Sequence, residues 1–146
     1  MCIRDRPDAD YIRDLFAARA AIEPAAVRWG EFADAPSLVT LTSSAFDYAA
    51  RGEHQEVSAI NQRFHRTLVA ALGSPTLNEQ MDNLLARMRL TFLLAIPRYP
   101  QLHADHIQGN ITLATLIADG KRLEAATLSH DSLMNTCEKI LAVLDD

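Results

Sequence analysis

The chain has 146 residues, the size of a single domain. Hydrophobic residues make up 49% of it, which is enough to bury a core and excludes a disordered chain. The formal net charge of −5, from 14 basic and 19 acidic residues, argues against direct binding to nucleic acid, because phosphate binding needs a basic face. No apolar run approaches the length of a membrane span. The two cysteines form no C-x-x-C pair, which favours free thiols in a reducing cytoplasm.

The first residues differ in kind from the rest of the chain. The segment Met1-Cys-Ile-Arg-Asp-Arg6 resembles a translated remnant of a sequencing adapter, and it lacks the apolar stretch of a signal peptide. We therefore expect residues 1–7 to be a non-native or disordered remnant and residues 8–146 to form the folded domain. We also expect the natural protein to continue upstream.

Two helices are predicted in the first third of the chain. From Asp8 or Asp10 onward, helical spacing of apolar residues predicts the first helix. Pro24 predicts a kink or a break near residues 20–23. A second helix is expected from residue 36 to about residue 51, where Gly52 ends it.

The third predicted helix, at about residues 54–72, is the one around which the others are arranged. Its apolar residues recur at every fourth position and form one stripe, made of Ile60, Phe64, Leu68 and Leu72. Asn61 and His65 are also four residues apart, so an amide and an imidazole lie one turn from each other beside that stripe.

Three more helices complete the prediction, at about residues 76–96, 102–118 and 121–144. Asp119-Gly120 lies between the last two and predicts the turn of an antiparallel helical hairpin. The fold class is therefore all-α, an antiparallel bundle of about six helices joined by short loops.

Histidines are the candidate metal ligands, because imidazole is the commonest protein ligand of transition metals. His65 is the strongest candidate, since Asn61 shares its helix face. His106 and His130 come from the two arms of the predicted hairpin, and both could approach from across the bundle. A purely structural role is the alternative for each of them.

Arg19 lies on the apolar face of the first helix, where a guanidinium is rarely buried without a partner. An ion pair with Glu23, four residues on, is one interpretation. A clamp for the carboxylate of a bound ligand is the other.

Catalytic motifs are scarce, because G-x-S-x-G, a P-loop and H-E-x-x-H are all absent from the sequence. Asp105-His106 and His130-Asp131 leave a helical metal-dependent phosphohydrolase as an alternative function, although such sites usually need several carboxylates around two metals. A degenerate bundle used only for dimerisation is the remaining alternative.

Three segments, in this order, resemble the C-terminal effector-binding (FCD-type) domain of GntR transcription regulators of the FadR branch. They are Arg19-Ala-Ala-Ile-Glu23, Asn61-Gln-Arg-Phe64-His65-Arg-Thr-Leu68 and Ile117-Ala-Asp-Gly120-Lys-Arg-Leu-Glu-Ala125. The likeness covers nearly all of residues 8–144, and the Phe-His segment is its most specific part.

The resemblance implies a cytoplasmic, non-enzymatic helical domain that binds a small metabolite, often a carboxylate, and that forms homodimers. It implies contact with DNA only through an N-terminal winged helix-turn-helix domain. It also implies that Arg19, Asn61, His65 and Asn110 bind the effector. The metal implied is one divalent transition ion, such as Zn, Ni or Mn, held by Asn61, His65, His106 and His130.

This sequence departs from the family pattern at two places. Asn61 stands where metal-binding members often have Asp, and the family places its last two histidines two residues closer together than His106 and His130. Alignment on Gly120 and Ala125 puts Asn110 and Ser132 at those ligand positions instead. Two residues along a helix rotate a side chain by about 200°, onto the other face.

Overall fold

The computed structural model describes residues 7–145. The predictions for the N-terminal remnant and for Cys2 fall almost wholly outside these residues. Within them the chain forms α-helices and one short 3₁₀ helix, without a strand. The elements are α1 (Ala9–Trp29), α2 (Ala35–Ser43), α3 (Ala45–Ala50), α4 (His54–Ala70), α5 (Pro75–Ala95), η2 (Ile96–Arg98), α6 (Leu102–Ala118) and α7 (Arg122–Leu144). The all-α bundle is confirmed, and among residues 7–145 no helix is both long and apolar enough to cross a membrane.

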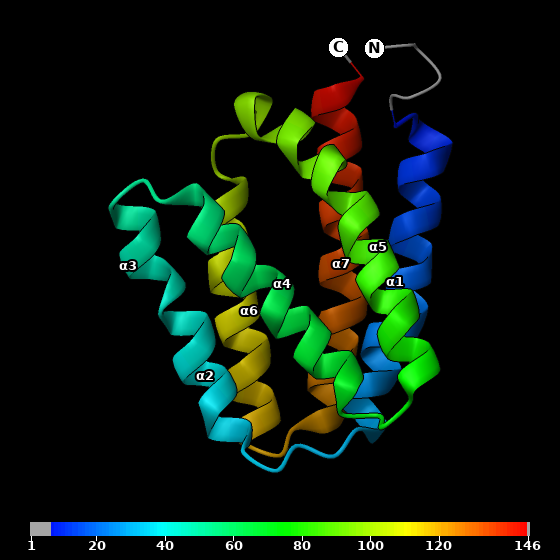
Figure 1. Ribbon diagram of the computed structural model, residues 1–146, viewed down its shortest axis with the longest axis vertical. Helices are drawn as coiled ribbons and strands as arrows, with labels where there is room; N and C mark the ends of the chain where they lie inside the picture. The colour runs from blue at the N-terminus through cyan, green and yellow to red at the C-terminus, as the bar shows by residue number, and fades with distance from the viewer. Residues whose placement is uncertain (1–6, 146) are drawn as a thin grey trace.

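The helices pack in antiparallel pairs (Figure 1). The most extensive pairs are α1 with α7 and α2 with α6, and α4 runs obliquely between α5 and the α2–α3 segment. One core cluster lies between α1, α5 and α7 and includes Phe16, Met88 and Ile140. A second lies around α4 and α6 and includes Phe64 and Leu113. The predicted stripe on α4 is therefore buried at its centre.

Local signals set most helix ends. The Asp8 carboxylate accepts a 2.8 Å hydrogen bond from the Tyr11 backbone N–H and caps α1. Ser74 caps α5 in the same way through the Leu77 N–H. Gly73 and Gly120 follow α4 and α6 with φ values of 68° and 76°, a conformation that favours glycine.

Two expectations about helix continuity differ from the structure: a break before Pro24, where the alternative of a kink stays a prediction, and a single helix over residues 36–51. First, α1 does not break before Pro24, because it runs on to Trp29. Second, the helix expected over residues 36–51 is two helices, α2 and α3, that meet at Ser44. The Ser44 hydroxyl donates a 2.6 Å hydrogen bond to the Leu41 carbonyl, and Thr42 bonds the Leu38 carbonyl, so side chains compete for the helical acceptors.

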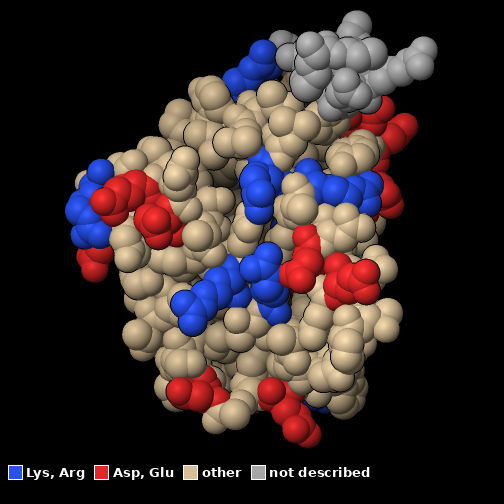
Figure 2. Space-filling model, in the orientation of Figure 1, with Lys and Arg blue, Asp and Glu red and all other residues tan. Residues whose placement is uncertain are grey.

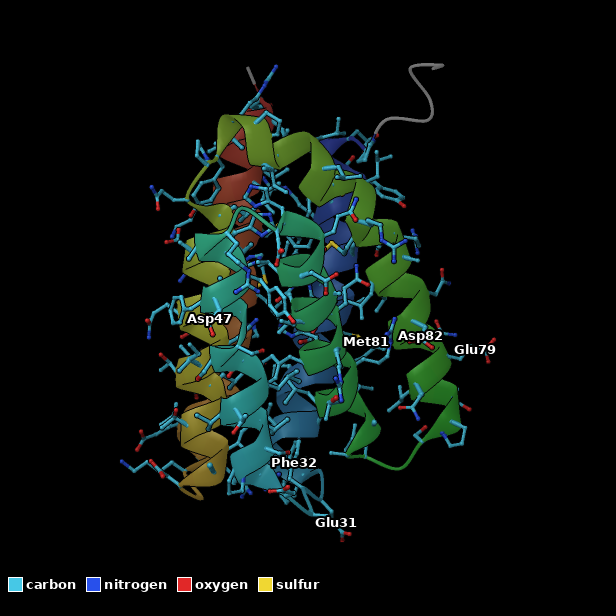
Figure 3. All side chains as sticks on the ribbon, turned by 60° about the vertical axis from the view of Figure 1, so that its left-hand side comes forward. Glu31, Phe32, Asp47, Glu79, Met81 and Asp82 are labelled. Carbon is cyan, nitrogen blue, oxygen red and sulfur yellow. The ribbon has the colours of Figure 1, made fainter. Side chains whose placement is uncertain are left out.

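Figure 3 shows how α5 divides its side chains. Met81 points toward the interior, while Glu79 and Asp82 point outward, in agreement with their burial. Asp82 forms an ion pair with Arg66, which joins the solvent sides of α4 and α5. This pair is exposed and screened by solvent, so we expect the apolar contacts to supply most of the packing energy.

The chain passes close to itself where α1 ends. Arg122, at the start of α7, donates hydrogen bonds to the carbonyls of Val27 and Gly30. The Glu31 N–H bonds the Ala71 carbonyl at the end of α4. These contacts satisfy carbonyls that the end of α1 leaves without helical partners. They also hold the ends of three helices together.

We predict that Gly30→Ala destabilises the fold by about 1–3 kcal/mol, because overpacking a close contact costs that much. A Cβ at Gly30 would lie 2.5 Å from the Ala26 carbonyl oxygen and 2.7 Å from the Ala71 Cβ. Gly109→Ala is the matched control, since a Cβ there meets nothing within 4 Å. Removing a helical glycine should raise stability by up to about 1 kcal/mol. Urea unfolding of both variants checks this, and equal stability would contradict the close approach.

Candidate functional site

The site is built around the carboxylate of Glu23, which is completely buried in the bundle. The Arg19 Nε donates a 2.6 Å hydrogen bond to Glu23 Oε2, and the His65 Nδ1 lies 2.5 Å from Glu23 Oε1. A carboxylate can only accept, so Nδ1 carries the proton in this contact. The predicted Arg19–Glu23 ion pair is thus confirmed, and it extends from α1 to His65 on α4.

These contacts control the charge of Glu23. Burial alone would raise the pKa of its carboxyl, but the charge of Arg19, the neighbouring His65 and their hydrogen bonds lower that pKa from 4.5 to about 2. Glu23 therefore stays ionised at any physiological pH. Within residues 7–145 the Arg19 guanidinium forms no hydrogen bond other than the one to Glu23, so its remaining N–H groups are left for a ligand.

Arg19 and His65 line a cavity of about 190 Å³, which we call the polar cavity. Four helices supply its polar wall: Arg19 from α1, Asn61 and His65 from α4, His106 and Asn110 from α6, and Ser129, Ser132, Asn135, Thr136 and Lys139 from α7. Asp105 is the one acidic residue on this wall within residues 7–145, and the Tyr99 hydroxyl donates a hydrogen bond to it. The cavity is thus rich in hydrogen-bond donors and in basic groups.

The pKa of His106 depends on burial and on the charged groups around the polar cavity. Burial lowers the pKa of its imidazole from 6.5 to about 3, and His65, Arg19, His103 and Lys139 lower it further by their positive charge. His106 is therefore neutral at pH 7. The basic side chains of Arg19 and Lys139 favour an anion near this ring, and the carboxylates of Glu23 and Asp105 offset that preference in part.

Five of the six predicted site residues line the polar cavity. They are Arg19, Asn61, His65, His106 and Asn110. The Asn110 amide donates a 2.7 Å hydrogen bond to the Asn61 carbonyl oxygen and so joins α6 to α4. The structure therefore brings the effector-binding residues predicted from the family resemblance around one space.

His130 lies elsewhere, and its expected place at the site is corrected. Its side chain is 54% exposed and contacts the Asp131 carboxylate on the outer surface of α7. Ser132 lines the polar cavity in its place. The reason is helical rotation, because residues 130 and 132 lie on different faces of α7.

The remaining residues do not fit a resident divalent metal. His65 and His106 could each offer one ring nitrogen to a metal, but Asn61 offers only an amide oxygen that already accepts from Asn110, and Asp105 accepts a hydrogen bond from Tyr99. Within residues 7–145, no three His, Cys, Asp or Glu side chains are grouped closely enough to hold an ion. Nearby Arg19 and Lys139 would also repel a cation. The two Asp–His pairs of the phosphohydrolase alternative likewise form no such group.

Some residues of the site escaped the sequence analysis. The bond from Glu23 to His65 was not predicted, since it joins residues 42 positions apart. On α7 only Ser132 was named from the sequence, and Ser129, Thr136 and Lys139 were missed although they follow helical spacing with it along one face. Polar residues at helical spacing along one face of α7 were the available signal.

We predict that the buried carboxylate of Glu23 makes the free energy of unfolding fall as the pH falls. Because the folded pKa of Glu23 is about 2 and its ordinary value is 4.5, the unfolded chain binds the proton first as the pH falls. The stabilisation is present above pH 4.5 and is lost toward pH 2, and it amounts to about 3 kcal/mol at 1.36 kcal/mol per unit. In Glu23→Gln this part of the pH dependence should disappear.

Urea unfolding between pH 7 and pH 3 measures this effect. At pH 7, Glu23→Gln should be destabilised by about 3–5 kcal/mol, because Arg19 keeps a buried charge without its partner. Because the pKa of His106 is also lowered in the fold, its protonation destabilises the fold at low pH as well. The test is therefore the difference in unfolding free energy between variant and wild type at each pH. Glu124→Gln, at an exposed position on α7, is the control and should behave as wild type. Identical curves for both variants would contradict the prediction.

Comparison with known proteins identifies the family of this chain. The family model described as "FCD domain" matches residues 14–134, which is most of the chain. No curated protein and no solved structure matches it. Residues 14–134 include Arg19, Glu23, Asn61, His65 and Asn110, so the whole polar wall except Asn135, Thr136 and Lys139 lies inside the match. The chain therefore belongs to the FCD family, whose domain is the C-terminal, effector-binding domain of GntR-family regulators.

Proposed function

We propose that this domain senses a small carboxylate metabolite for a bacterial GntR-type transcription regulator and that the polar cavity binds it. The observation that carries the proposal is the buried Arg19–Glu23–His65 group, which orients a guanidinium and an imidazole at a cavity wall. Charge-assisted hydrogen bonds from Arg to a carboxylate are among the strongest that proteins form. The domain acts as a regulator and not as an enzyme.

Lys139 supplies the second cationic group of the proposed site. Its side chain lies at the edge of the polar cavity and forms no ion pair within residues 7–145. A carboxylate between Arg19 and Lys139 would also meet the amides of Asn61 and Asn110. Asp105 lies on the same wall, where its bond to Tyr99 already occupies one of its oxygens. The balance of donors favours an anionic ligand.

A ligand in the polar cavity could change how the helices pack, because its contacts would come from several of them. Side chains of α1, α4, α6 and α7 meet at the polar cavity, so a bound ligand would contact four helices at once. A ligand shifts a conformational equilibrium only by its different affinity for the two states. In the proposed regulator, this shift alters the geometry of a homodimer and of DNA-binding domains attached to it.

Exposed apolar side chains support the homodimer. Trp29, at the end of α1, and Leu123, at the start of α7, are 70% and 67% exposed. The hydrogen bonds from Arg122 to Val27 and Gly30 bring these two helix ends together. We therefore propose these two exposed side chains as contacts of the homodimer.

We expect Lys139→Gln to weaken carboxylate binding by roughly three- to tenfold, because it removes one exposed, solvent-screened charge from the site. Calorimetry with a panel of mono- and dicarboxylates on the 146-residue chain measures this. Lys121→Gln is the matched control, since Lys121 is exposed and lies outside the cavity. The uncharged amide of the best acid should not bind.

The proposal fails if none of the acids binds the wild-type chain. It also fails if Lys139→Gln and Lys121→Gln lose affinity equally, because the carboxylate would then lie elsewhere.

We further expect that a metal is not needed for binding. Chelation with EDTA should leave the carboxylate affinity and the midpoint of thermal unfolding unchanged, since the donor set lacks an available group of three metal ligands. Added Zn²⁺, Ni²⁺ or Mn²⁺ should also have no effect. A midpoint that rises with one of these ions in the wild type, but not in His65→Gln, would establish the metal and contradict this expectation.

A further inference from the structure

A second cavity, larger than the first, lies between α3, α4, the end of α5 and the start of α6. Its volume is about 440 Å³, and we call it the apolar cavity. Most of its wall is hydrocarbon, contributed by residues such as Ala45, Val57, Ile60, Phe92, Leu93 and Ile107. Figure 2 shows a hollow on this face, between α3 and α5, beside basic side chains. Its volume lies within the range of about 300–1,000 Å³ that is typical of small-molecule sites, whereas the polar cavity is smaller than that range.

The apolar cavity adjoins the polar cavity. Five residues line both of them: Asn61, Phe92, Leu102, His106 and Asn110. Two side-chain pairs form much of this shared wall. Asn61 and Asn110 are joined by a single amide hydrogen bond, and the rings of Phe92 and His106 meet edge to face with centroids 5.2 Å apart. The boundary is thus made of side chains that can rotate.

The charged Arg89 on the wall of the apolar cavity is exposed and therefore screened by solvent. Burial lowers the pKa of His103, and His54 lowers it further by its charge, so that the His103 ring is neutral at pH 7. The two rings are stacked, with centroids 5.2 Å apart. Arg89 lies on the wall, where it bonds the Gln62 side chain. A neutral, hydrocarbon-rich body suits this space better than a second acidic group does.

We propose that the effector is a monocarboxylate with an apolar alkyl or aryl body. Its carboxylate binds in the polar cavity beside Arg19 and Lys139, and its body lies in the apolar cavity past the Asn61–Asn110 pair. This inference rests on the proposed carboxylate function and names the class of ligand for it. A short hydrophilic acid would leave the apolar cavity without a ligand.

A series of straight-chain acids tests this class. Calorimetry with acetate, butanoate, hexanoate and octanoate should give an affinity that rises roughly two- to fourfold per added methylene, because each buried methylene contributes hydrophobic free energy. The amide of octanoate should bind much more weakly than the acid, since it lacks the charge. Affinity that is equal for acetate and octanoate would overturn the inference and leave the carboxylate site intact. Failure of every acid would overturn the proposed function itself.

Two serine variants locate the apolar body. Ser58 lines the apolar cavity but not the polar cavity, so Ser58→Leu should fill part of the space that octanoate needs. We expect about a tenfold loss of octanoate affinity, with acetate affinity retained. Ser43→Leu on the exposed side of α2 is the matched control and should change neither affinity. If Ser58→Leu and Ser43→Leu bind octanoate alike, the body lies outside the apolar cavity and the inference is wrong.

Discussion

The buried carboxylate of Glu23 is the constraint on which the rest of the site depends. An ion without water must be compensated by partners of good geometry, or the fold loses several kcal/mol. Here the compensation comes from Arg19 on the same helix and His65 on another. Because the partners belong to two helices, the requirement fixes the position of α1 against α4. It also fixes the tautomer of His65 and the direction of the Arg19 donors.

Different residues stabilise the bundle and line the polar cavity. The hydrocarbon clusters around Phe16 and Phe64 hold the helices together on either side of the site. The polar cavity between those clusters is lined by side chains from four helices. Its donors are thus supported by rigid elements and not by loops, which favours a site with preset geometry. Motion is then expected in side chains at the cavity boundary before it is expected in the backbone.

Much of the fold was predictable from the sequence, because helical spacing and glycine turns are local signals. The ends of α4 and α6 at Gly73 and Gly120 are examples. The break at Ser44 was not predictable from apolar spacing, since it depends on hydroxyl groups that bond to their own helix. The site was half predictable. Asn61 and His65 follow from their spacing, but Ser132 replaces His130 through a rotation that only alignment on the hairpin turn suggested. The contact between Glu23 and His65 joins distant parts of the chain, and no local pattern encodes it.

The Asn61–Asn110 bond has a consequence for the breadth of recognition. A primary amide presents a donor on one side and an acceptor on the other, and a half-turn about its last bond exchanges them with almost no change of shape. If both amides turn together, the bond between them is preserved in the opposite sense. The same wall can then offer either a lone pair or an N–H to a guest. An aspartate at position 61 could only accept, so it is the asparagine that lets this wall present either kind of partner.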